Sequence, residues 1–322
     1  MTFIRKLRIC AGAAGLLLLA ALPSAAQTYP ARPVELVVPS SPGGGTDVMA
    51  RLFADVAKKY TTQPLIVTNR PGASGAIGMA EVQRAPADGY KVSVLISELA
   101  IIPSMGLAKY TSADFIPLAG LNADPATITV RADSSLKTIE DFIAQARKAP
   151  QAVSVGNSGV GSIWHLTAAA VEDRIGATFS NVPFQGSAPS VLALLGGHVD
   201  AIVVSPAEIA SYVSAGKLRA LVVMADKRLP GLYEQVPTFK ERNVDLSLGT
   251  WRGLGVVKGT PPEVVATLRD IARKTAADPA YLDAMHRANL TAVYSEPAAF
   301  GSYMAAQTEF FGKLMTRVRI DR

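Results

Sequence analysis

Short apolar segments alternate with helix-like segments along most of this chain of 322 residues. The run VELVV at 34–38 is followed by a helical pattern at 46–60, and PLIVTN at 64–69 is followed by another at 75–84. Each helix in such a series returns the chain across a sheet, so that the next strand starts in the same direction. The alternation therefore predicts an α/β fold built on parallel sheets.

The series divides into two parts. The run YKVSVLIS at 90–97 is followed by an irregular stretch that reaches Tyr110, and the alternation starts again near residue 126. A second sheet is the simplest explanation, because one continuous sheet would leave the irregular stretch without a place. The strands expected in the second part are at 126–130, 152–156, 178–184, 199–205 and 218–224, and the helices at 138–148, 162–175 and 187–195.

The end of the chain carries a strand pattern at 253–257 and then reads as wholly helical, with helices expected at 261–277, 279–288 and 297–317. Helices without strands of their own must cover a sheet formed elsewhere, and the strand at 253–257 leads back to the first one. Two crossings between domains are expected near 126–130 and 246–251. The predicted organisation is a signal peptide at 1–26, a discontinuous first lobe at 27–128 plus 250–322, and a second lobe at 129–249.

The first residues have the pattern of a secretory signal peptide. Basic residues precede an apolar centre, and Ser24 and Ala26 occupy the −3 and −1 positions for cleavage before Gln27. A membrane anchor is the alternative, but the apolar run contains two glycines and is shorter than the roughly 20 residues that span a bilayer. We therefore expect export to the periplasm with cleavage after Ala26.

Composition excludes several classes of function. Cys10 is the only cysteine and lies in the leader, so the mature chain should hold no disulfide, thiolate nucleophile or Cys-ligated zinc. Removal of the leader's three basic residues reduces the basic count from 32 to 29 against 26 acidic residues, without a basic patch for nucleic acid. The three histidines lack metal-ligand spacing, so neither a metal nor a cofactor is expected.

Turns of small residues follow several of the expected strands. Because these turns lie at the carboxyl ends of strands, where α/β folds bind ligands, they should converge on one crevice. A helix start presents unpaired N–H groups and a partial positive charge, and a turn without side chains lets an anion reach them. A carboxylate or phosphate is the expected ligand. The turns are PSSPGGGTD (39–47), NRPGASGAIG (69–78), GNSGVGSIWH (156–165) and FQGSAPS (184–190).

Other interpretations of these turns are weaker. The GGG segment could be a flexible connector, and ASGAIG departs from the dinucleotide fingerprint at Ala73. The turn after the strand at 152–156 resembles a nucleophile elbow but has Val160 where glycine is required. A secreted hydrolase that uses Ser158 or Ser162 with His165 stays an alternative. Asp47 could complement the dipole of its own helix or hold a polar group of a ligand.

Six segments of the chain resemble one family in order from Tyr29 to near the C-terminus. They are YPARPVELVVPSSPGGGTDVMAR, VTNRPGASGAIG, GNSGVGSIWHL, VPFQGSAPSVLALLGGHVDA, VPTFKE and WRGLGVVKGTPPEVV. Together they are similar to the extracytoplasmic solute receptors of the tripartite tricarboxylate transporters, called the Bug or TctC family. The resemblance implies a type II periplasmic binding protein, a Venus flytrap of two α/β lobes that holds a small organic acid between them for a membrane permease pair.

The resemblance also implies which residues contact the ligand. Family members hold carboxylates through main-chain N–H groups and waters in the turns, and the matching segments here come from both lobes. The candidate ligand-binding residues are Ser40, Ser41, Gly44, Gly45, Thr46, Asp47, Ala73, Gly75, Ala76 and Ser97 in the first lobe, and Asn157, Ser158, Gly161, Ser162, His165, Gln185, Gly186, Ser187 and Ser205 in the second.

The sequence departs from the family at several positions. Ser40 and Ser41 replace a common Phe and small residue, Phe184-Gln185 replaces Tyr-Lys or Tyr-Arg, and Ala193 replaces a frequent Asp. Loss of a cation at Gln185 favours a mono- or dicarboxylate over a tricarboxylate. We therefore expect a monomeric, non-enzymatic receptor for a small organic acid, with TctA/TctB-like membrane subunits as partners. A secreted serine hydrolase and a ligand sensor for a signalling receptor are the alternatives.

Overall fold

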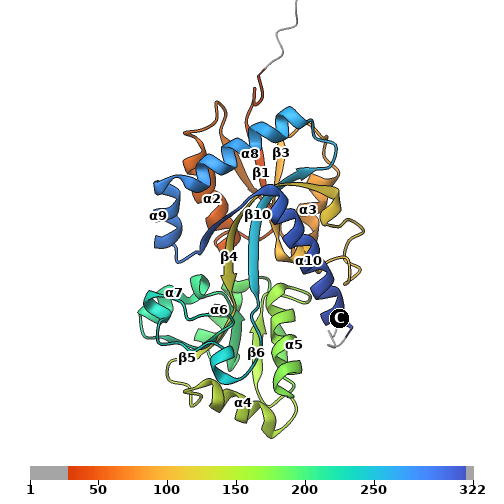
Figure 1. Ribbon diagram of the computed structural model, residues 1–322. Helices are drawn as coiled ribbons and strands as arrows, with labels where there is room; N and C mark the ends of the chain where they lie inside the picture. The colour runs from red at the N-terminus through yellow and green to blue at the C-terminus, as the bar shows by residue number, and fades with distance from the viewer. Residues whose placement is uncertain (1–27, 317–322) are drawn as a thin grey trace, which may run out of the picture.

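The computed structural model describes residues 28–316, so the predicted signal peptide at 1–26 lies outside the described residues. The fold has two α/β lobes arranged end to end (Figure 1), with the strands β4 and β10 running between them. The first sheet has six strands in the order β11-β4-β10-β3-β1-β2, and the second has five in the order β7-β6-β8-β5-β9. The expected two-lobed α/β fold is confirmed.

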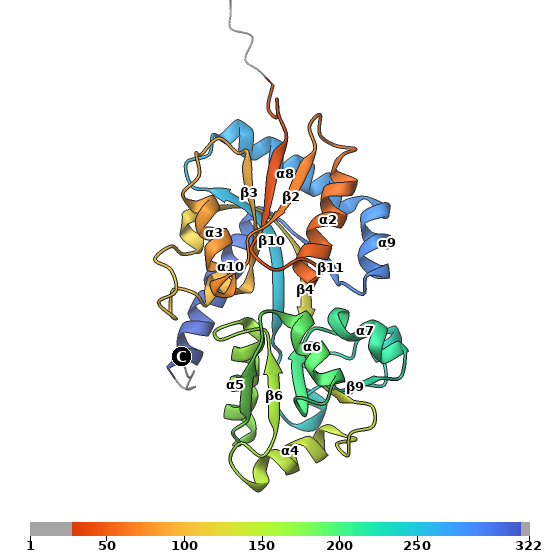
Figure 2. The same cartoon turned by 180° about the vertical axis from the view of Figure 1, so that it is seen from behind.

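The first lobe combines segments from both ends of the described chain, as the view from behind also shows (Figure 2). Its strands are β1 (Val34–Val38), β2 (Leu65–Asn69), β3 (Lys91–Ile96), β4 (Phe115–Pro125), β10 (Gly249–Val257) and β11 (Ala292–Ser295). Its helices are α2 (Gly45–Ala57), α3 (Ala76–Gln83), α8 (Pro262–Ala277), α9 (Pro279–Arg287) and α10 (Pro297–Met315), with short 3-10 helices η1 (Ala73–Gly75), η2 (Ser97–Ala100) and η3 (Ser112–Asp114).

The second lobe is one continuous stretch of chain. Its strands are β5 (Thr127–Arg131), β6 (Ser154–Asn157), β7 (Ser180–Pro183), β8 (Ala201–Val204) and β9 (Leu218–Val223). Its helices are α4 (Ile139–Lys148), α5 (Ile163–Ile175), α6 (Ser187–Leu195) and α7 (Pro206–Ser214), with 3-10 helices η4 (Gly231–Tyr233) and η5 (Lys240–Arg242). The limits drawn between the lobes from the sequence stay a prediction.

The expectation of parallel sheets is only partly correct. The strands β1, β2 and β3 are parallel, as are β6, β7 and β8, but β10 is antiparallel to both β3 and β4. The strand β5 is likewise antiparallel to β8 and β9. The reason is the double crossing: one strand carries the chain into the second lobe and another returns it, so their directions oppose.

Two strands and one α-helix were not predicted. The strand β4 contains Pro117, Gly120 and Pro125, which weaken a strand pattern. The helix α7 follows the strand β8 directly and has nine residues. The prediction of a wholly helical tail is wrong, because the four residues of β11 pair with β4 between α9 and α10. A strand of four residues such as β11 is held in place by pairing with its neighbour, so its own sequence carries little signal.

The crossing strands approach each other closely at the junction of the lobes. Gly249 pairs with Pro125, and a Cβ atom at Gly249 would lie 2.1 Å from the carbonyl oxygen of Asp124. Only glycine fits at this contact. Ala126, the residue between β4 and β5, donates its N–H to Leu248 O at 2.9 Å, which joins the two crossings.

Within residues 28–316, every helix is too short or too polar to cross a bilayer.

Candidate functional site

A cavity of about 700 Å³ lies between the lobes, and the four glycine-rich turns meet in its wall. Of the predicted site residues, those that line it are Ser40, Ser41, Gly44, Gly45, Thr46, Ala73, Gly75, Ser158, Ser162, Gln185, Gly186 and Ser187. The turns therefore converge as their positions after the strands suggested. That these residues bind a ligand stays a prediction.

The start of α2 is the part of this wall best suited to an anion. Gly44 at the N-cap has no side chain to accept a hydrogen bond from the helix, and the first helical bond runs from Val48 N to Gly44 O at 3.0 Å. The N–H groups of Gly45 and Thr46 therefore lie at an uncapped helix start in the cavity wall. The macrodipole of this 13-residue helix adds a partial positive charge there.

Asp47 does not line the cavity, and it orders the turn that precedes its own helix. Its Oδ2 accepts Gly43 N at 2.9 Å and Arg51 Nε at 3.0 Å, and its Oδ1 accepts Asn69 Nδ2 at 2.9 Å. Burial acts to raise the pKa of Asp47, but the hydrogen bonds from Arg51, Gly43 and Asn69 outweigh it and hold the pKa below its usual value. These contacts support the structural interpretation of Asp47.

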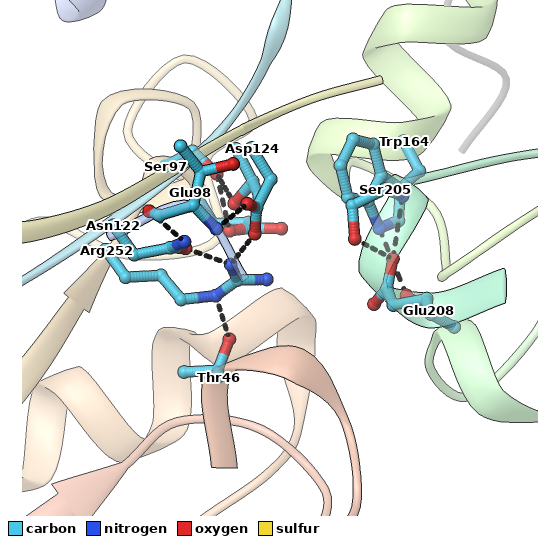
Figure 3. Close-up of polar contacts among 12 residues, drawn as sticks. Thr46, Ser97, Glu98, Asn122, Asp124, Trp164, Ser205, Glu208 and Arg252 are labelled. Carbon is cyan, nitrogen blue, oxygen red and sulfur yellow. Dashed lines mark hydrogen bonds and ion pairs between the residues drawn. The ribbon is translucent and has the colours of Figure 1, made fainter. Parts of the chain in front are cut away.

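Arg252, on β10, places a guanidinium beside the start of α2, and the sequence analysis missed it. Figure 3 shows Nε donating to Thr46 Oγ1, at 2.9 Å, and Nη1 donating to Asp124 Oδ2, also at 2.9 Å. Nη1 also donates to Asn122 Oδ1. The side chains of Arg252 and Asp124 are only 4% and 2% exposed. Arg252 directly precedes the apolar segment GLGVV. A charged residue beside an apolar strand was the signal that could have revealed it.

Glu98 is a second residue that the sequence analysis missed. It follows β3 in the buried turn η2 and lines the cavity. Its Oε1 accepts Ile163 N at 3.2 Å, at the start of α5 in the other lobe, and Ser97 Oγ lies 3.2 Å from its Oε2. Burial raises the pKa of Glu98, although these hydrogen bonds and Arg252 oppose the shift. The start of α5 is thus already occupied by a carboxylate of the protein.

The α5 turn has further internal partners. Ser162 Oγ accepts His165 N at 3.2 Å as an N-cap, and the His165 ring accepts Gly161 N at its Nδ1 at 3.1 Å. Asn157 Oδ1 accepts Gly159 N at 3.0 Å and closes the turn. These bonds order the backbone before α5, which explains why this turn needs its polar side chains.

The α6 and α7 starts differ from that of α2. Gly186 at the N-cap of α6 has no side chain, but Pro189 at the third position has no N–H, so one donor is missing. Trp164 Nε1 donates to Ser187 Oγ at 3.0 Å and closes this side of the wall. At α7, Glu208 accepts Ser205 N at 2.9 Å and Ser205 Oγ at 3.0 Å. The sequence signal for this capping box was the Ser205 to Glu208 spacing.

The remaining predicted residues are not part of the cavity lining. Ser97 Oγ is 3.1 Å from Thr250 Oγ1, which itself lines the cavity. The predicted residues outside the lining are Asp47, Ala76, Ser97, Asn157, Gly161, His165 and Ser205. Among residues 28–316, no group of three or more His, Cys, Asp or Glu side chains is placed to hold a metal ion.

Comparisons with known proteins agree on one family. Residues 49–319 match the model of the tripartite tricarboxylate transporter family receptor, TctC. The chain is 33% identical over 311 residues to a Cupriavidus necator protein described as "UPF0065 protein in gbd 5'region", covering 94% of this chain and 93% of that one.

Two solved structures extend this similarity. A ligand-free TctC solute-binding protein from Polaromonas is 52% identical, with a TM-score of 0.72 over 90% of this chain and 100% of its own. The R. palustris protein Rpa4515, solved with adipate, is 28% identical, with a TM-score of 0.83 over 89% of this chain and 97% of its own.

Proposed function

The chain belongs to the tripartite tricarboxylate transporter receptor family, and we propose that it captures a small organic acid between its lobes and delivers it to a permease of this transporter class. The family is one of substrate-binding receptors and not of enzymes. Members act in the periplasm, which agrees with the signal peptide predicted at 1–26. In this proposal the receptor acts as a monomer on TctA/TctB-like membrane subunits.

The observation that carries the proposal is the uncapped start of α2 in the wall of the cavity. The N–H groups of Gly45 and Thr46 can donate to a carboxylate there, and the Arg252 guanidinium lies against the same turn. Arg252 Nη2 makes no hydrogen bond within residues 28–316 and so has capacity for a ligand oxygen. The solved Rpa4515 relative is described with the dicarboxylate adipate, which supports a carboxylate as the ligand class.

The interaction free energies expected at the site can be compared with the free energy that micromolar binding needs. A helix N-terminus stabilises an anion by about 0.3–1 kcal/mol when exposed and up to ~2 kcal/mol when partly buried. Hydrogen bonds to charged groups contribute about 1.5–3 kcal/mol each. Micromolar binding needs about 8 kcal/mol. One helix start with two or three such bonds gives about 3–11 kcal/mol before the cost of association, so about 8 kcal/mol needs the upper part of this range. The apolar wall at Trp164, Phe184 and Leu192 can add burial of the ligand's body.

The proposal is tested with the mature chain, residues 27–322, purified without refolding. A panel of mono-, di- and tricarboxylates is screened by thermal shift and followed by isothermal titration calorimetry. We expect at least one acid to bind near one-to-one and to raise the Tm by linkage, without being consumed. Failure of the whole panel to shift the Tm, or turnover of an ester substrate that His165→Ala abolishes, would contradict it.

A separate experiment tests delivery. Membrane vesicles that contain the candidate permease subunits are supplied with labelled acid, with and without the receptor. Uptake should depend on the receptor. A ligand-dependent complex with a signalling receptor in place of uptake would favour the sensor alternative.

A further inference from the structure

The charges of the cavity wall do not match a ligand that is only an anion. Among the described residues that line it, the ionisable ones are Glu98, Glu208 and Arg252. The Arg252 guanidinium is paired with Asp124 at 2.9 Å, behind the wall. Glu98 already accepts hydrogen bonds from Ile163 and Ser97, so Glu208 adds a carboxylate to a wall whose one guanidinium is already matched.

Glu208 is the carboxylate with capacity to spare. Its Oε2 accepts both the N–H and the hydroxyl of Ser205, as Figure 3 shows. Its Oε1 has no hydrogen-bond partner among residues 28–316, and no cation pairs with the side chain in that part of the chain. The half-buried side chain lines the cavity from the second lobe. A cation or strong donor from the ligand can complete its bonding.

The helix starts α2 and α6 both lack a side-chain cap in the cavity wall, but in the described part of the chain only that of α2 has a guanidinium beside it. In the second lobe, the start of α5 is occupied by Glu98 from the first lobe, and α7 is capped by Glu208. The start of α6 keeps the N–H groups of Ser187 and Ala188 but loses the third donor to Pro189. The start of α2 has no side-chain cap and lies beside Arg252. Figure 3 shows the Arg252 group and Glu208 as two separate clusters, one from each lobe. A ligand that bridges them meets donors at one end and an acceptor at the other.

We infer that Glu208 selects a zwitterion, a carboxylate that also carries an ammonium or other cationic nitrogen. The carboxylate occupies the start of α2 in the first lobe, and the nitrogen donates to Glu208 Oε1 in the second. An anion without the nitrogen would exclude water from Glu208 without giving its Oε1 a partner, which disfavours lobe closure around it. This inference rests on the proposed function and names the ligand class of the same site.

The test compares matched ligands on matched variants. Each amino acid in the panel is paired with the acid in which hydrogen replaces the ammonium group, such as glutamate with glutarate and 4-aminobutyrate with butyrate. Glu208→Gln removes the charge but keeps an acceptor for Ser205, because glutamine also forms a capping box. Asp141→Asn is the control, since Asp141 serves the capping box of α4 outside the cavity.

The wild type should bind its best zwitterion at least tenfold more tightly than the paired acid, measured by calorimetry. Glu208→Gln should reduce this ratio at least tenfold by weakening the zwitterion, while Asp141→Asn leaves it unchanged. Tighter binding of the paired acid by the wild type, or an unchanged ratio in Glu208→Gln, would overturn the inference and leave the proposed function intact. If neither member of any pair binds, the proposed function itself fails.

Discussion

Arg252 combines a structural role with the binding role proposed for it in one side chain. Its guanidinium connects β10 to Asp124 on β4 and to Thr46 at the start of α2, so it fixes the helix start relative to the crossing strands. The pair is buried, and removal of one member of a buried pair leaves an uncompensated charge. The same group therefore supports both the fold and the proposed carboxylate site.

Replacing Arg252 separates these roles. Arg252→Met should lower the free energy of unfolding by about 3–5 kcal/mol, because Asp124 then remains buried without its partner. The double variant Arg252→Met/Asp124→Asn should recover much of this loss and still fail to bind carboxylate. Urea denaturation and calorimetry measure the two effects. Recovery of binding in the double variant would contradict a direct role for Arg252.

Gly45 faces Arg252 Nη2 from the start of α2, so a substitution at Gly45 tests the position of the guanidinium. A Cβ atom at Gly45 would lie 2.9 Å from Arg252 Nη2, whereas one at Gly44 would meet only Ser41 O at 3.8 Å. We expect Gly45→Ala to shift only the Nη2 end of the guanidinium and weaken carboxylate binding at least tenfold. The change in Tm should be small, because Nε and Nη1 keep their bonds to Thr46 and Asp124 and alanine favours the helix. Gly44→Ala is the comparison variant. Equal losses in both would show that added bulk, and not the position of Arg252, reduces binding.

At this scale the sequence predicted backbone features better than side chains. The glycines before α2 could be identified because an uncapped turn between strand and helix has few other uses. Arg252 and Glu98 could not, because whether a strand or turn residue faces a cavity depends on register and on the partner strand. Their signal was only that a charged residue interrupts an apolar run.

At the scale of elements, α9 packs on α2 through Phe53 and Tyr281, and the carboxylate of Asp278 joins its start to the residues that follow α2. Asp278 caps α9 by accepting Ala280 N at 2.8 Å, and its Oδ2 accepts Lys59 Nζ at 2.9 Å and Tyr60 OH at 2.7 Å. The hydrogen bonds from Lys59, Tyr60 and the Ala280 N–H lower the pKa of Asp278 to about 2. The folded state thus favours the charged form of this carboxyl.

This shift predicts a pH dependence of stability. Because the pKa is depressed in the folded state, the stabilisation by Asp278 is present above the unfolded pKa of about 4 and is lost as the pH falls toward 2. Asp278→Asn keeps the N-cap acceptor but loses the charge. The gap in Tm between wild type and variant should be constant above pH 5 and close as the pH falls toward 2. A gap that persists unchanged at low pH would contradict this role.

Most elements could be predicted because they carry their own periodicity. The helix limits at α4 and α6 fall within one residue of expectation. The exceptions, β4 and β11, depend on neighbours: β4 is ordered by pairing with β10, and β11 pairs only with β4. The antiparallel strands at the crossings follow from the chain passing twice between lobes, which no local pattern records.

At the scale of the whole molecule, two hydrogen bonds connect the lobes beside the cavity. Glu98 Oε1 accepts Ile163 N at 3.2 Å, and Ser74 Oγ donates to Val160 O at 2.9 Å. Both contacts must break if the lobes separate to admit a ligand. The protonation state of Glu98 therefore bears on the stability of the closed arrangement.

Glu98 should make the protein less stable as the pH rises. Burial raises its folded pKa above the unfolded value of about 4.3, so the folded state holds the proton more tightly. Stability is then lost as the pH rises from the unfolded pKa through the folded one. Glu98→Gln keeps an acceptor for Ile163 and removes this slope. Its Tm should gain on that of the wild type from pH 4.5 upward, and a constant difference across pH would contradict the assignment.

The most direct test of how the lobes hold their ligand is a crystal structure of the mature chain with its acid bound. We predict a ligand carboxylate within about 3 Å of the N–H groups of Gly45 and Thr46 and of Arg252 Nη2. The rest of the ligand should reach the second lobe. A carboxylate seated only at the start of α6, or a ligand outside the cavity between the lobes, would contradict it.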